Sequence, residues 1–456
     1  MKRQLLSFLV SCVTNAALLL LTATTALPLL TSCSDSDTPA TGDIALGTVS
    51  VGLSNYSTLS ANYSVTLRNT VTNAVFSQTF DSSVPDQRTV FSVPPGIYEA
   101  TAAGRFTQNG KLCTQNGSYG QIIVRKDQVT SITIDLRTSV ASQLVIKELY
   151  NGGCMMDDGV TKFQNDKCVI LYNNTAEPAM LTNLCIGFSA PYNAQATNNN
   201  YNADGRLTYE SEGFTPVLDG YWYFPQPLTV APFSQVVVNV HGAIDNTQTV
   251  SQSVNYANAD YYCMYDPEVG YSNTSYYPTP SSVIPTSHYL KAAKWSLSNA
   301  WPLSVSSPAM VLFLIPTGTP AGYAADTANQ WYDGGTAQAS KLCIKIPNEW
   351  IIDAVEVYSA ADQSKCSKRL TADIDAGYVW LTNFQGHSLY RNVDREATEA
   401  LAQNEGRLVY GYTLGDDPST IDAEASTAGG ASIVYQDTNN STTDFHERAL
   451  CSLRNK

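Results

Sequence analysis

The sequence is poor in charge and in histidine. Only 14% of its 456 residues are charged, and histidine occurs four times, at His241, His288, His387 and His446. These positions lack the short spacings of a metal-binding motif. The chain also has no Cys-x-x-Cys pair and no Gly-x-Ser-x-Gly elbow. The sequence therefore predicts no catalytic residues, no metal site and no cofactor, and we expect a non-enzymatic role.

Positive charge is scarcer than negative charge. Lysine and arginine total 26 against 40 aspartate and glutamate residues, so the formal net charge is −14. An acidic surface repels phosphate backbones, which excludes nucleic acid as an expected partner. The 43% hydrophobic content is enough to bury a large core, and the length predicts two to three domains.

Long hydrophobic runs are absent except at the amino terminus. Lys2 and Arg3 precede an apolar region that includes residues 16–21, and no acidic residue occurs before Asp35. This layout is typical of a secretory signal. A plain signal peptide and a transmembrane anchor are the alternatives, but Pro28 and a threonine-rich stretch interrupt the apolar run, whereas a membrane span needs about 20 apolar residues.

The end of this leader, Leu30-Thr31-Ser32-Cys33, resembles the bacterial lipobox, in which the cysteine is acylated and the chain is cut before it. The resemblance implies a signal peptide over 1–32, lipid attachment at Cys33 and a flexible acidic tether over 33–42. Ser34-Asp35-Ser36-Asp37 is similar to the acidic signal of surface lipoproteins in Bacteroidetes. We therefore expect a lipid-anchored outer-membrane protein facing the cell exterior, with the periplasmic face as the alternative.

The remaining sequence is typical of an all-β protein. Short strand-like runs recur from residue 45 to residue 136, and in the last of them Ile132, Ile134 and Leu136 alternate with polar residues. Asn109-Gly110 between two runs predicts a hairpin turn. This spacing predicts a small β-sandwich over 43–138, and the segment PPGIYEATAAGRF within it resembles prealbumin-like (Ig-like) modules.

A second domain is expected over 143–456. The runs LVIKELYNGG, KCVILYNNT and LTNLCIGF, with SLYRN and DTNNSTTDF near the end, resemble a lamin-tail-type domain, an immunoglobulin-like sandwich. A Tyr- and Asn-rich stretch near 190–300 has no counterpart in small lamin tails, so it is expected to form long loop insertions. One short helix is expected at 393–406, with Asp394 as its cap and Gly406 at its end.

Taken together, the chain resembles an uncharacterised family of Bacteroidetes outer-membrane lipoproteins, a domain of unknown function. The resemblance implies an accessory or binding role beside a TonB-dependent outer-membrane receptor. An outer-membrane receptor or another surface protein is thus the expected partner, in addition to membrane lipid. An adhesin or fimbria-like structural subunit is the alternative function, and an enzyme is the least favoured class.

Aromatic residues concentrate in the predicted insertion and form the candidate binding surface. Tyrosine and tryptophan offer apolar faces with polar edges, which suit a protein partner or a glycan. Packing inside the domain is the alternative. The candidate residues are Tyr221, Trp222, Tyr261, Tyr262, Tyr276, Tyr277 and Trp295.

Eight cysteines follow Cys33. Their even number in an exported chain permits one or two disulfides, although the position of several within apolar runs favours buried thiols. No pairing follows from the sequence.

Overall fold

A computed structural model describes residues 46–454 except 61, 109–110, 270–273, 298–300 and 302. The signal peptide, Cys33 with its tether and the Asn109-Gly110 turn lie outside the described residues. The described fold belongs to one compact unit, residues 45–456. Within the part that the structure describes, no helix is long and apolar enough to cross a membrane.

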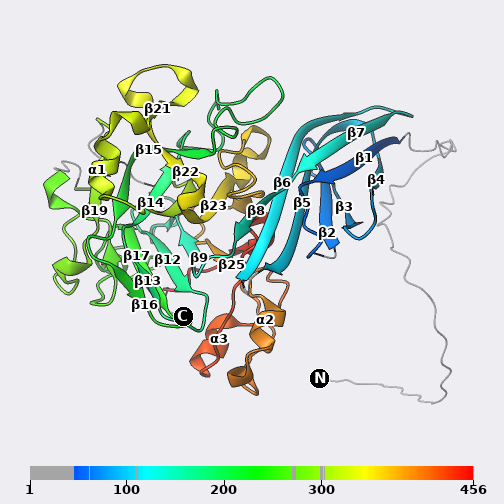
Figure 1. The fold of residues 1–456 in the computed structure, drawn as a ribbon. Helices are drawn as coiled ribbons and strands as arrows, with labels where there is room; N and C mark the ends of the chain where they lie inside the picture. The colour runs from blue at the N-terminus through cyan, green and yellow to red at the C-terminus, as the bar shows by residue number, and fades with distance from the viewer. Residues whose placement is uncertain are drawn as a thin grey trace, which may run out of the picture. The chain divides into compact units, whose positions relative to one another are not determined.

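The fold is all-β, as the sequence predicts (Figure 1). The first eight strands form a small sandwich of two sheets, ordered β4-β1-β7 and β3-β2-β5-β6-β8. Its strands are β1 (Gly47–Ser54), β2 (Asn62–Asn69), β3 (Val75–Asp81), β4 (Thr89–Val93), β5 (Gly96–Gln108), β6 (Lys111–Val124), β7 (Val129–Asp135) and β8 (Arg137–Val140).

The core of the small sandwich is formed by apolar side chains that alternate with polar ones along its strands. Ile132 and Ile134 on β7 are buried, while Thr133 and Asp135, which alternate with them, are exposed. Side chains of β1, β2, β4, β5 and β6 meet them in one cluster. Gln108 pairs with Lys111, so the ladder between β5 and β6 extends to the residues on either side of 109–110.

Residues from Leu144 onward form a larger sandwich of two sheets. The first is ordered β18-β17-β12-β9-β25-β26, and the second is ordered β21-β22-β15-β14-β20-β23-β24, with β19 beside β15. The first sheet contains β9 (Leu144–Tyr150), β12 (Lys167–Asn173), β17 (Gln235–His241), β18 (Tyr262–Cys263), β25 (Ser388–Arg391) and β26 (Phe445–Arg448).

The second sheet contains β14 (Leu184–Ser189), β15 (Phe214–Tyr223), β19 (Lys291–Lys294), β20 (Ala309–Leu314), β21 (Gln330–Tyr332), β22 (Leu342–Pro347), β23 (Ile351–Ser359) and β24 (Val379–Leu381). Two short ribbons complete the strands, β10 (Cys154–Met155) with β11 (Lys162–Phe163) and β13 (Ala179–Leu181) with β16 (Leu228–Val230).

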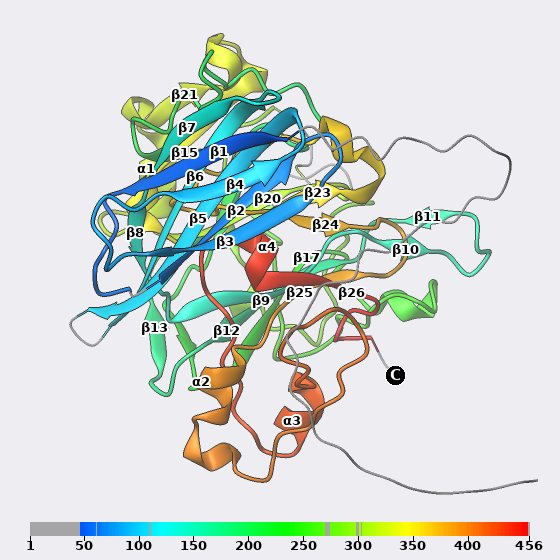
Figure 2. The ribbon, with the colours of Figure 1, turned by 90° about the vertical axis from the view of Figure 1, so that its right-hand side faces the viewer.

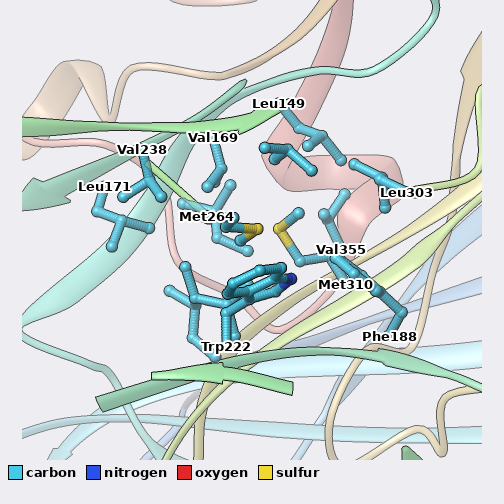
Figure 3. Close-up of a cluster of buried hydrophobic side chains, with 14 of the residues drawn as sticks. Leu149, Val169, Leu171, Phe188, Trp222, Val238, Met264, Leu303, Met310 and Val355 are labelled. Carbon is cyan, nitrogen blue, oxygen red and sulfur yellow. The ribbon is translucent and has the colours of Figure 1, made fainter. Parts of the chain in front are cut away.

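The main core lies between these two sheets. Figure 3 shows Trp222 and Met310 of the second sheet meeting Val169 and Val238 of the first, with Met264 among them. A buried ion pair also joins the sheets, because Arg391 on β25 donates to Asp353 on β23 at 2.5 Å. Breaking such a pair would leave an uncompensated buried charge.

Both sheets of the larger sandwich are covered on their outer faces as well. Alternate residues of β12 show this, since Val169 and Leu171 face the main core while Cys168 and Ile170 join a second cluster behind the sheet. Strands buried on both sides lose the polar and apolar alternation that marks a half-exposed strand. This explains why β12 and β14 lack polar alternation within their apolar runs, and why every residue of β9 is buried, including Lys147 and Glu148.

The helical content differs from the prediction of one short helix. Four α-helices occur in the described chain: α1 (Pro320–Ala325), α2 (Arg395–Glu399), α3 (Ala423–Ala428) and α4 (Ser441–Asp444). Asp394 caps α2 by accepting from the Ala397 amide at 3.0 Å, as predicted. The helix stops at Ala400 rather than Gly406, because the Asn404 side chain donates to the Thr398 carbonyl and to the Ser432 carbonyl.

Candidate functional site

Three of the predicted surface aromatics lie in the core instead. Tyr221 and Trp222 are 0% exposed and Tyr277 is 3% exposed. The segment GYWYFP was expected among loops, but Gly220 to Tyr223 belong to β15, which runs between β14 and β22. Because that sheet is covered on both faces, Tyr221 and Trp222 are buried on opposite sides of it.

The other four candidates, Tyr261, Tyr262, Tyr276 and Trp295, are half-buried. Trp295 donates its indole N–H to the Leu342 carbonyl at 2.9 Å and its ring packs on Tyr221. The ring of Tyr276 lies 6.1 Å from that of His241. These two side chains therefore contact the body of the sandwich.

Tyr262 belongs to a group of partly exposed rings, the aromatic strip, whereas Tyr261 packs against the apolar cluster behind the first sheet. The members of the aromatic strip are Tyr262, Tyr265, His288 and Tyr289.

The strip is held together by ring contacts between two chain segments. The Tyr262 and His288 rings stack at 4.2 Å with an angle of 15° between their planes, and Tyr265 meets Tyr289 edge to face at 5.6 Å. A parallel bridge between Cys263 and Tyr289 aligns the two segments. The sequence shows both segments to be aromatic, but only the fold pairs them.

Charged groups adjoin the strip. Lys291 donates to Asp266 at 3.3 Å and lies 2.9 Å from Glu268, whose side chain is 80% exposed. The Glu268 and Asp266 carboxylates raise the pKa of Lys291, which therefore carries a positive charge at neutral pH. Flat apolar rings beside polar groups suit stacking on a sugar ring or packing against a protein side chain.

A second polar group is buried at the start of β12. Lys167 is 2% exposed and donates to the Leu303 carbonyl at 2.5 Å. Burial lowers the pKa of this lysine to about 7 and raises the pKa of Asp166 to about 7. Burial also lowers the pKa of His241, and neither of its ring nitrogens has a hydrogen-bond partner among the described residues.

A lysine with a lowered pKa is a common nucleophile or base in enzymes. Here a substrate would have to reach an amine that the surrounding chain covers almost completely. The geometry therefore favours a structural role for Lys167, in which its neighbours hold the amine inside the sandwich.

Two surface hollows are lined jointly by the small and the larger sandwich. One, of about 390 Å³, lies between Thr70, Val71 and Asn73 on one side and residues 360–365 on the other. The other, of about 580 Å³, is lined by Arg137, Thr138 and Val140 of β8, by Ser142, and by residues of the larger sandwich that include Asn348 and Asp373. Among the described residues, no group of three or more His, Cys, Asp or Glu side chains is placed so that it could hold a metal ion.

Comparison with known proteins gives a family match over part of the chain and a likeness to solved structures. A family model described as "Protein of unknown function (DUF4876)" matches residues 231–413, a stretch that includes the aromatic strip. The chain is also similar to a crystal structure of a DUF4876 family protein from Bacteroides thetaiotaomicron. That likeness has 20% sequence identity and a TM-score of 0.50, and covers 87% of this chain and 94% of the other. No curated protein sequence gives a significant match.

Proposed function

We propose that this protein is a surface-exposed outer-membrane lipoprotein that binds a partner without catalysing a reaction, as an accessory component of a TonB-dependent uptake system. The observation that carries the proposal is Leu30-Thr31-Ser32-Cys33, followed at once by an acidic tether. A signal of this type yields an acylated amino terminus, and attachment of more than one lipid chain makes anchoring stable. The prealbumin-like resemblance of residues 94–106 fits this context, because such modules are common in exported Bacteroidetes proteins.

The lipid anchor is tested by Cys33→Ala, because acylation of the thiol precedes cleavage of the signal. We expect the variant to remain as an uncleaved or soluble precursor, while the wild type carries radiolabelled fatty acid in the outer-membrane fraction. Protease added to intact cells then distinguishes exterior from periplasmic exposure. A Cys33→Ala protein that is still lipid-labelled in the outer membrane would contradict the proposal.

The aromatic strip is the binding surface that we propose for the partner, either the outer-membrane receptor or a glycan. A stacked ring contributes about 0.5–1.5 kcal/mol beyond the area it buries. We therefore expect the double variant Tyr262→Ala with Tyr289→Ala to weaken capture of the receptor from detergent-solubilised outer membranes by about tenfold or more.

Tyr276→Ala is the matched control, because Tyr276 is also a half-buried tyrosine but packs on His241. It should leave binding unchanged. Thermal melting of both variants separates a binding defect from misfolding, since truncating a fully buried aromatic costs about 3–5 kcal/mol. A double variant that melts normally and binds normally would remove the strip as the binding surface.

A further inference from the structure

Two cysteines from distant parts of the chain meet behind the first sheet of the larger sandwich. Cys168 lies on β12, and Cys451 follows β26 near the end of the described residues. Both are 0% exposed and share one apolar cluster with Tyr150 and Val254. The two side chains are free thiols in the structure, and Cys168 is among the neighbours that, after burial, raise the pKa of Cys451.

The backbone around Cys451 is fixed to the same sheet independently of the sulfur atoms. The Ser452 amide donates to the Glu148 carboxylate at 2.9 Å, and the Ser452 hydroxyl also donates to it. Glu148 on β9 pairs with Ile170, and Tyr150 pairs with Cys168. Side chains two residues apart on a strand point to the same face, so these contacts place Cys451 on the side of the sheet that Cys168 faces.

Other buried thiols have different partners. Cys185 donates to the Asn183 carbonyl at 3.3 Å and Cys343 to the Lys341 carbonyl at 3.6 Å, each within its own strand segment. These two are buried small side chains with satisfied donors. Cys168 and Cys451 differ from these two cysteines because they are far apart in the sequence but lie in the same buried cluster.

We propose that Cys168 and Cys451 form a disulfide in the exported protein, which ties the segment after β26 to the centre of the first sheet. This proposal rests on the proposed function, because the disulfide requires that the protein is located outside the reducing cytosol. One Sγ–Sγ bond forms as the two thiols lose two protons and two electrons. A thiol–disulfide exchange oxidant accepts both and is reduced from its disulfide to its dithiol.

Exchange proceeds in two steps. The thiolate of one cysteine attacks the oxidant and displaces one of its sulfurs, and the thiolate of the second cysteine then attacks the mixed disulfide and displaces the other. Burial raises the pKa of Cys451 in the folded chain. The reaction therefore belongs to the stage of folding at which the carboxyl-terminal segment still moves on and off the sheet.

Thiol labelling of the full chain, purified from outer membranes, tests the proposal. The protein is denatured in the presence of a maleimide, which alkylates free thiols, with and without prior reduction. The number of maleimide labels per chain is then determined by mass spectrometry. We expect six labels without reductant and eight with it, because eight cysteines follow Cys33. Peptide mapping should recover a linked peptide containing Cys168 and Cys451. Eight labels without reductant, or protection of two other cysteines, would overturn the proposal.

The melting temperature gives a second readout. A reductant should lower it for the wild type and for the control Cys343→Ala, but not for Cys168→Ala with Cys451→Ala. If that double variant does not fold, the thiol labelling of the wild type still shows whether the disulfide forms. The membrane fraction is recorded for the same cells, so a correctly located protein with eight reactive thiols would refute the disulfide and leave the proposed function standing.

Discussion

His446 on β26 lies in a buried polar environment that fixes its ring in one tautomer. Asn392 donates its amide N–H to the Thr443 carbonyl at 2.7 Å, so its carbonyl oxygen faces His446 Nδ1, 2.7 Å away. Nδ1 therefore carries the proton, and Nε2 accepts from the Tyr412 hydroxyl at 2.9 Å. Burial, together with the charge of Arg448, lowers the pKa of His446 to about 4.

The lowered pKa predicts a loss of stability in acid. Between pH 6.5 and 4 the unfolded chain binds a proton at this histidine that the folded chain does not, so this group lowers the free energy of unfolding as the pH falls. The loss should reach about 2–3 kcal/mol near pH 4.5. It should be absent in His446→Gln, which cannot titrate.

The measurement is a proton or carbon NMR titration of the four histidines, in which the resonance missing from His446→Gln assigns the residue. Denaturant unfolding at pH 7 and pH 4.5 then compares the two proteins. A His446 resonance that titrates near 6.5, or an equal loss of stability in both proteins, would contradict the environment described for this ring.

At the scale of single elements, α2 is a helix of five residues whose first turn depends on one side chain. Asp394 accepts from the Ala397 amide, and its other oxygen lies 3.3 Å from Arg105 on β5 of the small sandwich. Asp394→Ala removes both interactions. An N-cap contributes about 0.5–2 kcal/mol, and a partly exposed ion pair contributes up to about 1 kcal/mol.

We therefore expect Asp394→Ala to lower the free energy of unfolding by about 1–2 kcal/mol, as measured by denaturant unfolding. Asp394→Asn is the matched control, since asparagine caps as well as aspartate does but carries no charge. It should retain most of the stability and the slow hydrogen exchange of the Ala397 amide. Equal destabilisation by the two variants would show that the ion pair, and not the cap, is the main contribution.

The elements also show what a sequence pattern can reveal. The alternation of Ile132 and Ile134 with polar residues predicts a strand that exposes one face to solvent, and Asp394 predicts the start of a helix. Both predictions are correct because each pattern depends only on neighbouring residues. The prediction of a surface loop at Tyr221 and Trp222 is wrong. These residues lie on β15, and they are buried by segments that are distant in the sequence, which the local pattern does not reveal. The stacking of Tyr262 on His288 likewise arises from pairing of separate segments.

At the scale of the whole molecule, the small and the larger sandwich have separate cores but touch through specific polar contacts. The Asn116 amide donates to the Thr438 carbonyl at 2.5 Å although Asn116 is 1% exposed. The Ser142 amide donates to Asp437 at 2.9 Å. The sequence predicts two sandwiches, over 43–138 and 143–456, but these contacts depend on residues some 300 positions apart and carry no local pattern.

The order of strands in the first sheet of the larger sandwich has a consequence for the timing of folding. Figure 2 shows β9, β25 and β26 side by side, and Ser388 on β25 donates to Glu148 on β9 across 240 positions of sequence. A chain that emerges amino terminus first can close the small sandwich early, because β1 to β8 are contiguous. The edge of β9 that pairs with β25, however, remains unpaired until β25 has been synthesised. Such long-range pairing is slow, and an open strand edge invites association with other chains. Until β25 pairs with it, the edge of β9 is therefore the part of this sheet at which association with another chain is expected.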